Sequence, residues 1–556
     1  MVNIVPANWN FVPVPSVKPN PIIASIDIGT NSLHIVVVRI EPTLPTFTVI
    51  AKEKETVRLG DRNLETGDLK PEVMKKAIAC LDRFQELAKS FEADNIIAVA
   101  TSAVREAPNG RSFLHQIETE LGLNVDLISG QEEARRIYLG VLSGMEFNQK
   151  PHIIIDIGGG STELILGNSQ ESRSLTSTKI GAVRLTGELI TTDPIGNTEF
   201  QYLQAYVKGM LERSVEDILS KLQPGEIPKL VGTSGTIETI ATIHAKEKMG
   251  IVPSTLNGYC FSLHDLQTWV TRLKRMSNVE RSAISGMPDR RSEVILAGAV
   301  ILQEAMRLLG LETITVCERS LREGVIVDWM LTHGFIADRL QYQSSIRERN
   351  VLKLAQKYHI NLECSQRVAE FALTLFSQTQ GKLHNWGENA RELLWAGAIL
   401  HNCGHHISHS AHHKHSYYLI RNGELLGYNE TEIEIIANLA RYHRKSPPKK
   451  KHENYQNLTH KEHRQMVSQL SAILRVAVAL DRRQIGAVRG IKCEYFPTIR
   501  QLEIVVSPSK YDDDCDLEMW SLDLKRQVFE QEFGVKLVAH LAQLSKCANA
   551  QASSQD

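Results

Sequence analysis

The chain has 556 residues, of which 42% are hydrophobic and 23% charged, and its formal net charge at pH 7 is −1. A chain of this length is long enough to form several domains, each with its own buried core. The near-neutral charge argues against a nucleic-acid-binding protein that is basic throughout. The 8 cysteines include no Cys-x-x-Cys pair, which favours a reduced, cytoplasmic protein, and no apolar run is long enough to predict a membrane span.

The first hairpin of the chain carries a glycine turn. Residues 1–20 are rich in proline and lack the features of a signal peptide, which predicts a disordered leader. An apolar strand then ends in Asp27-Ile-Gly-Thr-Asn-Ser32, and a second apolar strand follows. Glycine in such a turn lets backbone amides approach an anion closely. The candidate phosphate contacts are Asp27, Gly29, Thr30, Asn31 and Ser32.

A helical crossover over residues 71–90 leads to a buried strand over residues 95–100 and a helix start with Arg105 in its first turn. An arginine at the end of a strand and beside a helix N-terminus is well placed to grip a phosphate with two hydrogen bonds. The alternative is a surface ion pair with Glu106 or a neighbour. This segment by itself favours the ion pair.

The next helix begins after Ser129-Gly130 with two glutamates. Acidic residues in a first turn complement the helix dipole and need no further explanation. The functional alternative is that one of the pair points into a cleft and acts as a general base. Glu133 shares its helix face with Ile137 and Gly140, which turns that face inward, whereas Glu132 shares a face with Arg136 and is expected in solvent.

A second hairpin, over residues 153–166, repeats the first with more glycines. The repeat predicts an internally duplicated α/β fold whose two turns face each other across a cleft. The carboxylates of Asp156 and Glu163 would repel a phosphate unless a hard cation such as Mg²⁺ lay between them. The stretch therefore predicts a metal-assisted phosphate site, with candidate phosphate contacts at Gly158, Gly159, Gly160, Ser161 and Thr162.

A third glycine turn follows the strand at residues 230–231 and precedes a helix. Turn amides at a helix N-terminus make an anion site, although glycines can also serve only to permit the turn. The two earlier turns favour the anion site. Its candidate contacts are Gly232, Thr233, Ser234, Gly235 and Thr236.

The sequence pattern changes after a polar stretch at residues 334–350, and helical periodicity dominates beyond it. The histidine-dense segment 401–416 indicates either a metal site or a basic wall that binds phosphate with Lys414. The lysines at 449–451 are typical of a solvated loop. We expect boundaries at 21–145 and 146–333 for two related subdomains, 345–485 for a helical domain, 486–545 for a small α+β segment and 546–556 for a disordered tail.

Five motifs in this order resemble the exopolyphosphatase/guanosine pentaphosphate phosphohydrolase family. They are Asp27-Ile-Gly-Thr-Asn-Ser, Ser129-Gly-Gln-Glu-Glu-Ala-Arg, Asp156-Ile-Gly-Gly-Gly-Ser-Thr-Glu, Gly232-Thr-Ser-Gly-Thr and Leu321-Arg-Glu-Gly. The resemblance implies duplicated ribonuclease-H-like domains of the actin/hexokinase type over residues 20–330. It implies a mostly helical, HD-like domain with a small α+β part over residues 340–545.

The resemblance also implies roles for single residues. Glu133 is similar to the family's general base, Arg105 to its phosphate-gripping arginine, and Asp156 and Glu163 to the carboxylates that hold Mg²⁺. The implied activity is hydrolysis of the terminal phosphate of inorganic polyphosphate by water. The same chemistry on guanosine pentaphosphate is the main alternative. A homodimer is the expected assembly.

The C-terminal domain departs from a working HD phosphohydrolase, which needs an upstream histidine, a His-Asp pair and a distant aspartate. Asn402 follows His401, Asp481 matches the distant aspartate, and residues 371–376 offer no histidine. An amide is a weaker ligand for a hard cation. We therefore expect no catalytic metal there, and instead a basic wall along the substrate channel and a dimer contact.

Two other functions fit parts of the sequence. A kinase of the same fold would transfer phosphate to an acceptor, but the placement of Glu133 and the lack of an acceptor-binding segment argue against it. A regulator that only binds polyphosphate or an alarmone would need no intact site. The joint presence of Arg105, Glu133, Asp156 and Glu163 argues against such decay.

Overall fold

The computed structural model describes residues 20–542, except 43, 45, 64, 148–149, 289, 337–345, 424, 426 and 459. The predicted leader up to residue 19 and the predicted tail lie outside the described residues. The chain forms two compact units, one running to Arg347 and including Leu426–Glu430, the other comprising Glu348–Leu425 and the chain from Thr431. No described helix is long and apolar enough to cross a membrane.

The first sheet of the first unit has five strands in the order β3-β2-β1-β4-β5. β1, β2 and β3 form an antiparallel meander, and β4 and β5 run parallel to β1. Apolar side chains of α1 and α3, such as Phe84 and Phe113, pack on one face of this sheet. The bounds are β1 (Ile22–Ile28), β2 (Ser32–Glu41), β3 (Thr46–Thr56), α1 (Pro71–Ser90), β4 (Asn95–Ala100), α2 (Ser102–Arg105), α3 (Gly110–Leu121) and β5 (Val125–Leu127).

The second sheet has six strands in the order β10-β11-β9-β6-β7-β8 and repeats the topology of the first. β6, β7 and β8 form the meander, and β9 and β11 are the parallel strands. The first unit is thus an α/β structure with two mixed sheets. The strand bounds are β6 (His152–Ile157), β7 (Thr162–Gly167), β8 (Ser172–Thr178), β9 (Lys229–Thr233), β10 (Cys260–Ser262) and β11 (Thr313–Val316). The helices are α5 (Ala182–Leu189), α6 (Asn197–Ser220), α7 (Gly235–Met249), α8 (Leu263–Leu273), α9 (Asn278–Ser282) and α10 (Ile295–Leu309).

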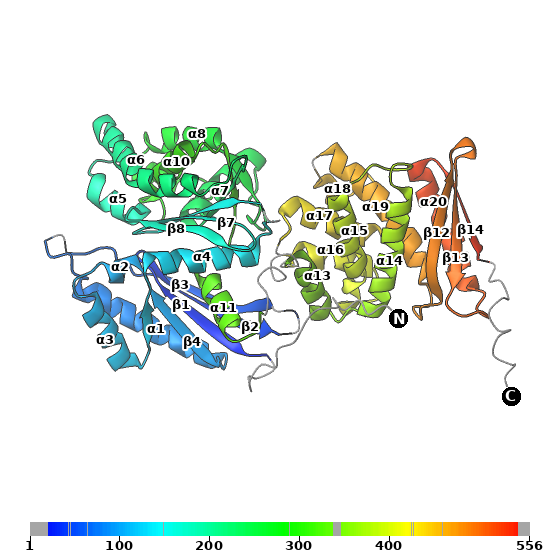
Figure 1. Ribbon diagram of the computed structural model, residues 1–556, viewed down its shortest axis with the longest axis horizontal. Coiled ribbons are helices and arrows are strands. Elements are labelled where there is room, and N and C mark those ends of the chain that lie inside the picture. The colour runs from blue at the N-terminus through cyan, green and yellow to red at the C-terminus, as the bar shows by residue number, and fades with distance from the viewer. Residues whose placement is uncertain are drawn as a thin grey trace. The chain divides into compact units, whose positions relative to one another are not determined.

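Two helices, α4 (Gly130–Gly144) and α11 (Leu321–Thr332), lie between the two sheets (Figure 1). They cross at glycines. A Cβ on Gly140 would lie 1.9 Å from the Ser320 carbonyl oxygen, and one on Gly324 would lie 1.7 Å from that of Arg136. Because no side chain separates the backbones, the two helices hold each other in a fixed position.

The second unit is mostly helical and ends in a small sheet of three strands, in which β12 pairs antiparallel and β14 parallel with β13. Its helices are α13 (Ile346–Lys357), α14 (Leu362–Thr379), α15 (Glu388–Leu400), α16 (His412–Arg421), α17 (Glu430–Tyr442), α18 (Glu453–Gln456), α19 (Lys461–Leu480) and α20 (Asp516–Phe533). The 3₁₀ helices are η1 (Cys403–His406) and η2 (Pro497–Ile499), and the strands are β12 (Val488–Phe496), β13 (Gln501–Pro508) and β14 (Lys536–Leu541).

Candidate active site

The two predicted phosphate turns meet in the first unit. Each is closed by the same hydrogen bond, in which Gly29 N–H donates to the Ser32 carbonyl at 3.2 Å and Gly158 N–H to the Ser161 carbonyl at 3.0 Å. A Cβ on Gly160 would lie 2.8 Å from Thr30 Oγ1, so the glycine permits this contact between the turns. The turns of the two sheets therefore face each other at close range, and the residues that surround them are called the cleft below.

Three carboxyl groups lie at the base of these turns, of which Asp156 and Glu163 are buried and Asp27 is half-buried. Asp27 is the next-to-last residue of β1, Asp156 is the next-to-last residue of β6, and Glu163 lies opposite Asp156 on β7. Burial and the neighbouring carboxylates raise the pKa of Asp27 to about 7, against the opposing effect of Arg322. Burial raises the pKa of Asp156 to about 6, and burial, Glu133 and Asp156 together raise that of Glu163 well above its usual value.

Arg105 and Glu133 form an ion pair beside the carboxyl groups. Arg105 Nη1 donates to Glu133 Oε2 at 3.2 Å and to the Ile128 carbonyl at 2.8 Å. Of the ion-pair partners that the sequence left open for Arg105, Glu106 is not the one, because it accepts from Arg184 Nη2 at 2.6 Å. Burial is the main cause that raises the pKa of Glu133 to about 8. Arg105 opposes this rise, and the carboxylates of Asp27 and Asp156 add to it.

The two glutamates at the start of α4 divide as their helix faces predicted. Ser129 Oγ caps the helix by accepting from Glu132 N–H at 3.2 Å. The carboxylate of Glu132 pairs with Arg135 at 2.7 Å and Arg136 at 2.8 Å, and these partners lower its pKa. Glu133, by contrast, is only 7% exposed and faces the cleft carboxylates.

The donor set suits a hydrated divalent cation. Asp27 Oδ1 is buried without a hydrogen-bond partner, whereas Asp156 Oδ2 accepts from Ser320 and Glu163 Oε1 from Ser177. Among the described residues, no three His, Cys, Asp or Glu side chains are gathered so that they alone could hold a metal. Mg²⁺ needs only one or two carboxylates, since water and phosphate oxygens complete its shell. Asp156 and Glu163 fit that requirement, with Asp27 beside them.

The third predicted turn joins β9 to α7 and is tied to the end of β6. Ser234 Oγ donates to the Ile157 carbonyl at 2.8 Å, and Thr236 Oγ1 donates to the same oxygen at 3.3 Å. Ser234 adopts a φ of 87°, which is rare for a residue with a side chain. Thr233 Oγ1 donates to the Arg319 carbonyl and Thr162 Oγ1 to the Ile180 carbonyl. These hydroxyls hold the turns in place.

Cationic side chains that the sequence did not single out line the same cleft. Arg322 Nη1 lies 3.1 Å from His34 Nδ1, and burial together with Arg322, Lys54 and Arg291 lowers the pKa of His34 to about 2. The Arg291 guanidinium packs on Gly235, where a Cβ would lie 2.0 Å from its Nη2 atom. Only the Leu321-Arg-Glu-Gly motif signalled this region, because the other residues come from distant segments.

Known proteins resemble this chain in sequence and in fold. The model of the Ppx/GppA phosphatase family matches residues 36–333, and that of Ppx/GppA phosphatase domain III matches residues 346–526. A guanosine-5'-triphosphate,3'-diphosphate pyrophosphatase of Aliivibrio fischeri (strain MJ11) is 30% identical over 472 residues, which are 84% of this chain and 87% of that protein. Its counterpart in Pseudoalteromonas atlantica is 29% identical over 85% of this chain and 88% of its own length.

Among solved structures, an exopolyphosphatase from Cytophaga hutchinsonii is 28% identical and superposes with a TM-score of 0.52. It covers 57% of this chain and 99% of its own chain.

Proposed function

The chain belongs to the Ppx/GppA phosphatase family, and from this premise we propose that it is an exopolyphosphatase, which releases terminal phosphate from inorganic polyphosphate. The observation that carries the proposal is the buried Glu133, paired with Arg105 where the phosphate turns meet. Some relatives are named for polyphosphate and others for a guanosine nucleotide, and in both substrates the bond that is cleaved is a phosphoanhydride. The chain is thus a phosphoanhydride hydrolase.

Glu133 acts as the general base in this scheme. Water must lose a proton as it attacks the terminal phosphorus, and a carboxylate with a pKa raised to about 8 is a far stronger base than an ordinary glutamate. Arg105 donates to the terminal phosphate and fixes its orientation relative to Glu133. The turn amides of Gly158 to Ser161 and of Gly232 to Gly235 bind the remaining phosphate oxygens.

We propose Mg²⁺ as the cofactor, held by Asp156 and Glu163 with Asp27 beside them. When bound, the ion neutralises charge on the phosphoanhydride oxygens. Ser320 and Ser177 orient two of the carboxylates, since each serine donates to one of them at 2.5 and 2.7 Å respectively. Two like charges 4 Å apart repel by about 4 kcal/mol at the effective dielectric of a protein surface. The carboxyl cluster therefore favours a bound cation.

The closest alternative is hydrolysis of guanosine pentaphosphate to the tetraphosphate. Two relatives that match over more than four fifths of this chain carry the name of that activity. The cationic end of the cleft, with Arg291 and Arg322, would suit a second phosphate group as well as the next unit of a chain. A regulator that binds these substrates without hydrolysis is the remaining alternative.

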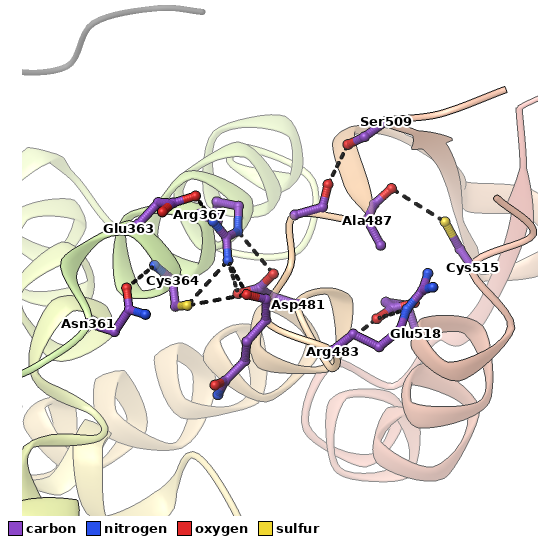
Figure 2. A network of polar contacts seen from close by, with 12 residues as sticks. Asn361, Glu363, Cys364, Arg367, Asp481, Arg483, Ala487, Ser509, Cys515 and Glu518 are labelled. Carbon is purple, nitrogen blue, oxygen red and sulfur yellow. Dashed lines mark hydrogen bonds and ion pairs between the residues drawn. The ribbon is translucent and has the colours of Figure 1, made fainter. Parts of the chain in front are cut away.

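For the second unit we propose an HD-like fold that holds no catalytic metal. Arg367 pairs with Asp481, the aspartate matched to the distant HD ligand, at 3.0 Å (Figure 2). Its guanidinium also donates to the Gln484 carbonyl at 2.9 Å. A charged arginine on this carboxylate competes with any divalent cation. We further propose that the enzyme works in the cytoplasm as a homodimer, and the absence of disulfides among the described cysteines supports that compartment.

The decisive experiment measures phosphate release with Mg²⁺ from long-chain polyphosphate and from guanosine pentaphosphate, by wild type, Glu133→Gln and Glu132→Gln. We expect wild type to prefer polyphosphate and Glu133→Gln to lose activity on both substrates. A preference for guanosine pentaphosphate would establish the alternative. The absence of hydrolysis by wild type, with binding retained, would identify a regulator.

A further inference from the structure

The first unit has two halves, one carrying the sheet of β1 to β5 and the other the sheet of β6 to β11, and ion pairs connect them. Arg184 of α5, in the second half, donates from Nη2 to Glu106 Oε2 at 2.6 Å, at the end of α2 in the first half (Figure 1). Arg58 Nη2 donates to Glu293 Oε2 at 2.7 Å. The side chains of Arg184 and Glu106 are only 18% and 12% exposed, whereas those of Arg58 and Glu293 are 40% and 45% exposed.

Arg184 is attached to the glycine turn of residues 158–161 through both its backbone and its side chain. The backbone N–H groups of Val183 and Arg184 each donate to the Gly159 carbonyl at 3.0 Å. Arg184 Nε donates to the Gly160 carbonyl at 2.9 Å. Because the guanidinium is planar, this bond also fixes the direction of Nη2. The second half therefore presents a fixed cationic donor to the first half.

Glu106 is the corresponding attachment point in the first half, and it follows Arg105 directly. Its backbone N–H donates to the Ser102 carbonyl at 3.1 Å, and its Oε1 accepts from Ser102 Oγ at 3.0 Å. Burial would raise the pKa of Glu106, but the hydrogen bond and the charge of Arg184 lower it, so the carboxylate is ionised at neutral pH. α2 has only 4 residues, so these contacts fix the position of Arg105 more than helix length does.

The two halves are in close contact where this bridge lies. A Cβ on Gly160 would lie 2.6 Å from Ser102 Oγ and 2.8 Å from Thr30 Oγ1. Arg105 and the glycine turn thus lie at the two ends of a short chain of contacts that runs through Glu106 and Arg184. A change in the spacing of the halves moves one end of this chain relative to the other.

We propose that Arg184 is a positioning residue that holds the two halves at the spacing of one phosphate group, by bridging Glu106 and the Gly160 carbonyl. The proposal rests on the proposed function, in which Arg105 and the glycine turn bind the same terminal phosphate from opposite halves. Arg184 acts through these two groups and does not bind the phosphate itself. Contacts that are already in place need no rearrangement when the substrate binds, so the bridge increases the affinity for a phosphate chain.

The first test is hydrogen exchange of the full chain without substrate, so its result does not depend on the proposed reaction. Gly158 N–H, which donates to the Ser161 carbonyl, reports on the second half. Glu106→Ala changes the first half, and we expect it to speed the exchange of Gly158 N–H by about tenfold. Arg58→Met, which removes the exposed ion pair between the same halves, is the matched control and should leave this exchange unchanged. Equal exchange of Gly158 N–H in the two variants overturns the proposal.

The second test is calorimetric titration with tripolyphosphate and Mg²⁺, in a Glu133→Gln background that does not hydrolyse the ligand. Arg184→Met should weaken binding by about tenfold or more. Arg184→Lys keeps the charge beside Glu106 but replaces the two donor atoms of the guanidinium by one, so it should stay weakened. Arg184→Met combined with Glu106→Ala should bind no more weakly than Arg184→Met, because both changes cut the same bridge.

Binding by Arg184→Lys that equals that of its parent would show that the charge alone suffices, and it overturns the bridge. Losses that add in the double variant overturn it as well. If the Glu133→Gln parent does not bind tripolyphosphate, the proposed function fails, and the exchange of Gly158 N–H still decides whether Arg184 couples the halves.

Discussion

The cleft of the first unit and the buried histidines His401, His412 and His443 of the second unit show the same physical effect with opposite sign. Burial raises the pKa of Asp27 to about 7 in the cleft, and it lowers the pKa of His401 to about 4 in the second unit. In both places burial disfavours the charged form of the side chain. The two regions differ in how their polar atoms are satisfied: Asp27 Oδ1 has no hydrogen-bond partner, whereas His401 Nδ1 faces the Ala398 carbonyl at 2.6 Å.

The largest expected effect is on the base in the cleft. Glu133→Gln keeps the shape of the side chain and removes its ability to accept a proton, so kcat should fall by about two to four powers of ten. Glu132→Gln is the matched control, because Glu132 is the half-buried neighbour of Glu133 and pairs with Arg135 and Arg136. Equal losses in the two variants, measured as phosphate release, would contradict the division between the two glutamates.

The next effect is on stability and concerns Asp481, a buried carboxylate of the second unit that Arg367 neutralises. Arg367→Met leaves Asp481 buried without its partner, and loss of one member of a buried pair costs about 3 kcal/mol of unfolding free energy. The double variant Arg367→Met with Asp481→Leu should recover most of this loss. Arg391→Met, which removes an exposed pair with Glu388, should change stability by less than about 1 kcal/mol. Denaturant titration that shows equal losses for Arg367→Met and Arg391→Met would show that Asp481 does not need the arginine.

The sequence predicted those parts of the cleft that local patterns specify. Asp27 and Asp156 follow apolar strands and precede glycine turns, and the repeated pattern predicted both the duplicated sheets and their facing turns. The sequence did not predict that Ser320 donates to Asp156 from 164 positions away, nor that Glu106 pairs with Arg184. Such pairs depend on how α11 and α5 pack, and no local periodicity encodes that packing.

The glycine crossing of α4 and α11 should matter more than glycines elsewhere. In Gly324→Ala the new Cβ would meet the Arg136 carbonyl, so the helices must separate, at a cost of about 1–3 kcal/mol. Gly209→Ala in α6 is the control, because a Cβ there has no heavy atom within 4 Å and alanine favours a helix. We expect the melting temperature to fall in Gly324→Ala and to rise slightly in Gly209→Ala. Equal melting temperatures in the two variants would mean that α4 and α11 can move apart without loss of stability.

The smallest effect is the pH dependence of stability, which should have opposite signs for the raised carboxyl pKa values and the lowered imidazole pKa values. It is measured in buffer without divalent cations or phosphate. Asp27 and Glu133 have folded pKa values raised to about 7 and 8, so their stabilising contribution is full below pH 4.5 and is lost as the pH rises through 8. His401 and His412 have folded pKa values lowered to about 4, so their contribution is present above pH 6.5 and is lost as the pH falls through 4.

Between pH 5 and 6.5 the two regions should therefore respond in opposite directions, each by about 1 kcal/mol per group. Hydrogen exchange, corrected for the intrinsic pH dependence of the amide rates, should show α4 becoming less protected as the pH rises and α17 more protected. Adding Mg²⁺ should reduce the response of α4 alone. Parallel changes in the two helices would show that the carboxylates and the imidazoles do not control the stability of their own regions separately, because a global change in stability moves both helices together.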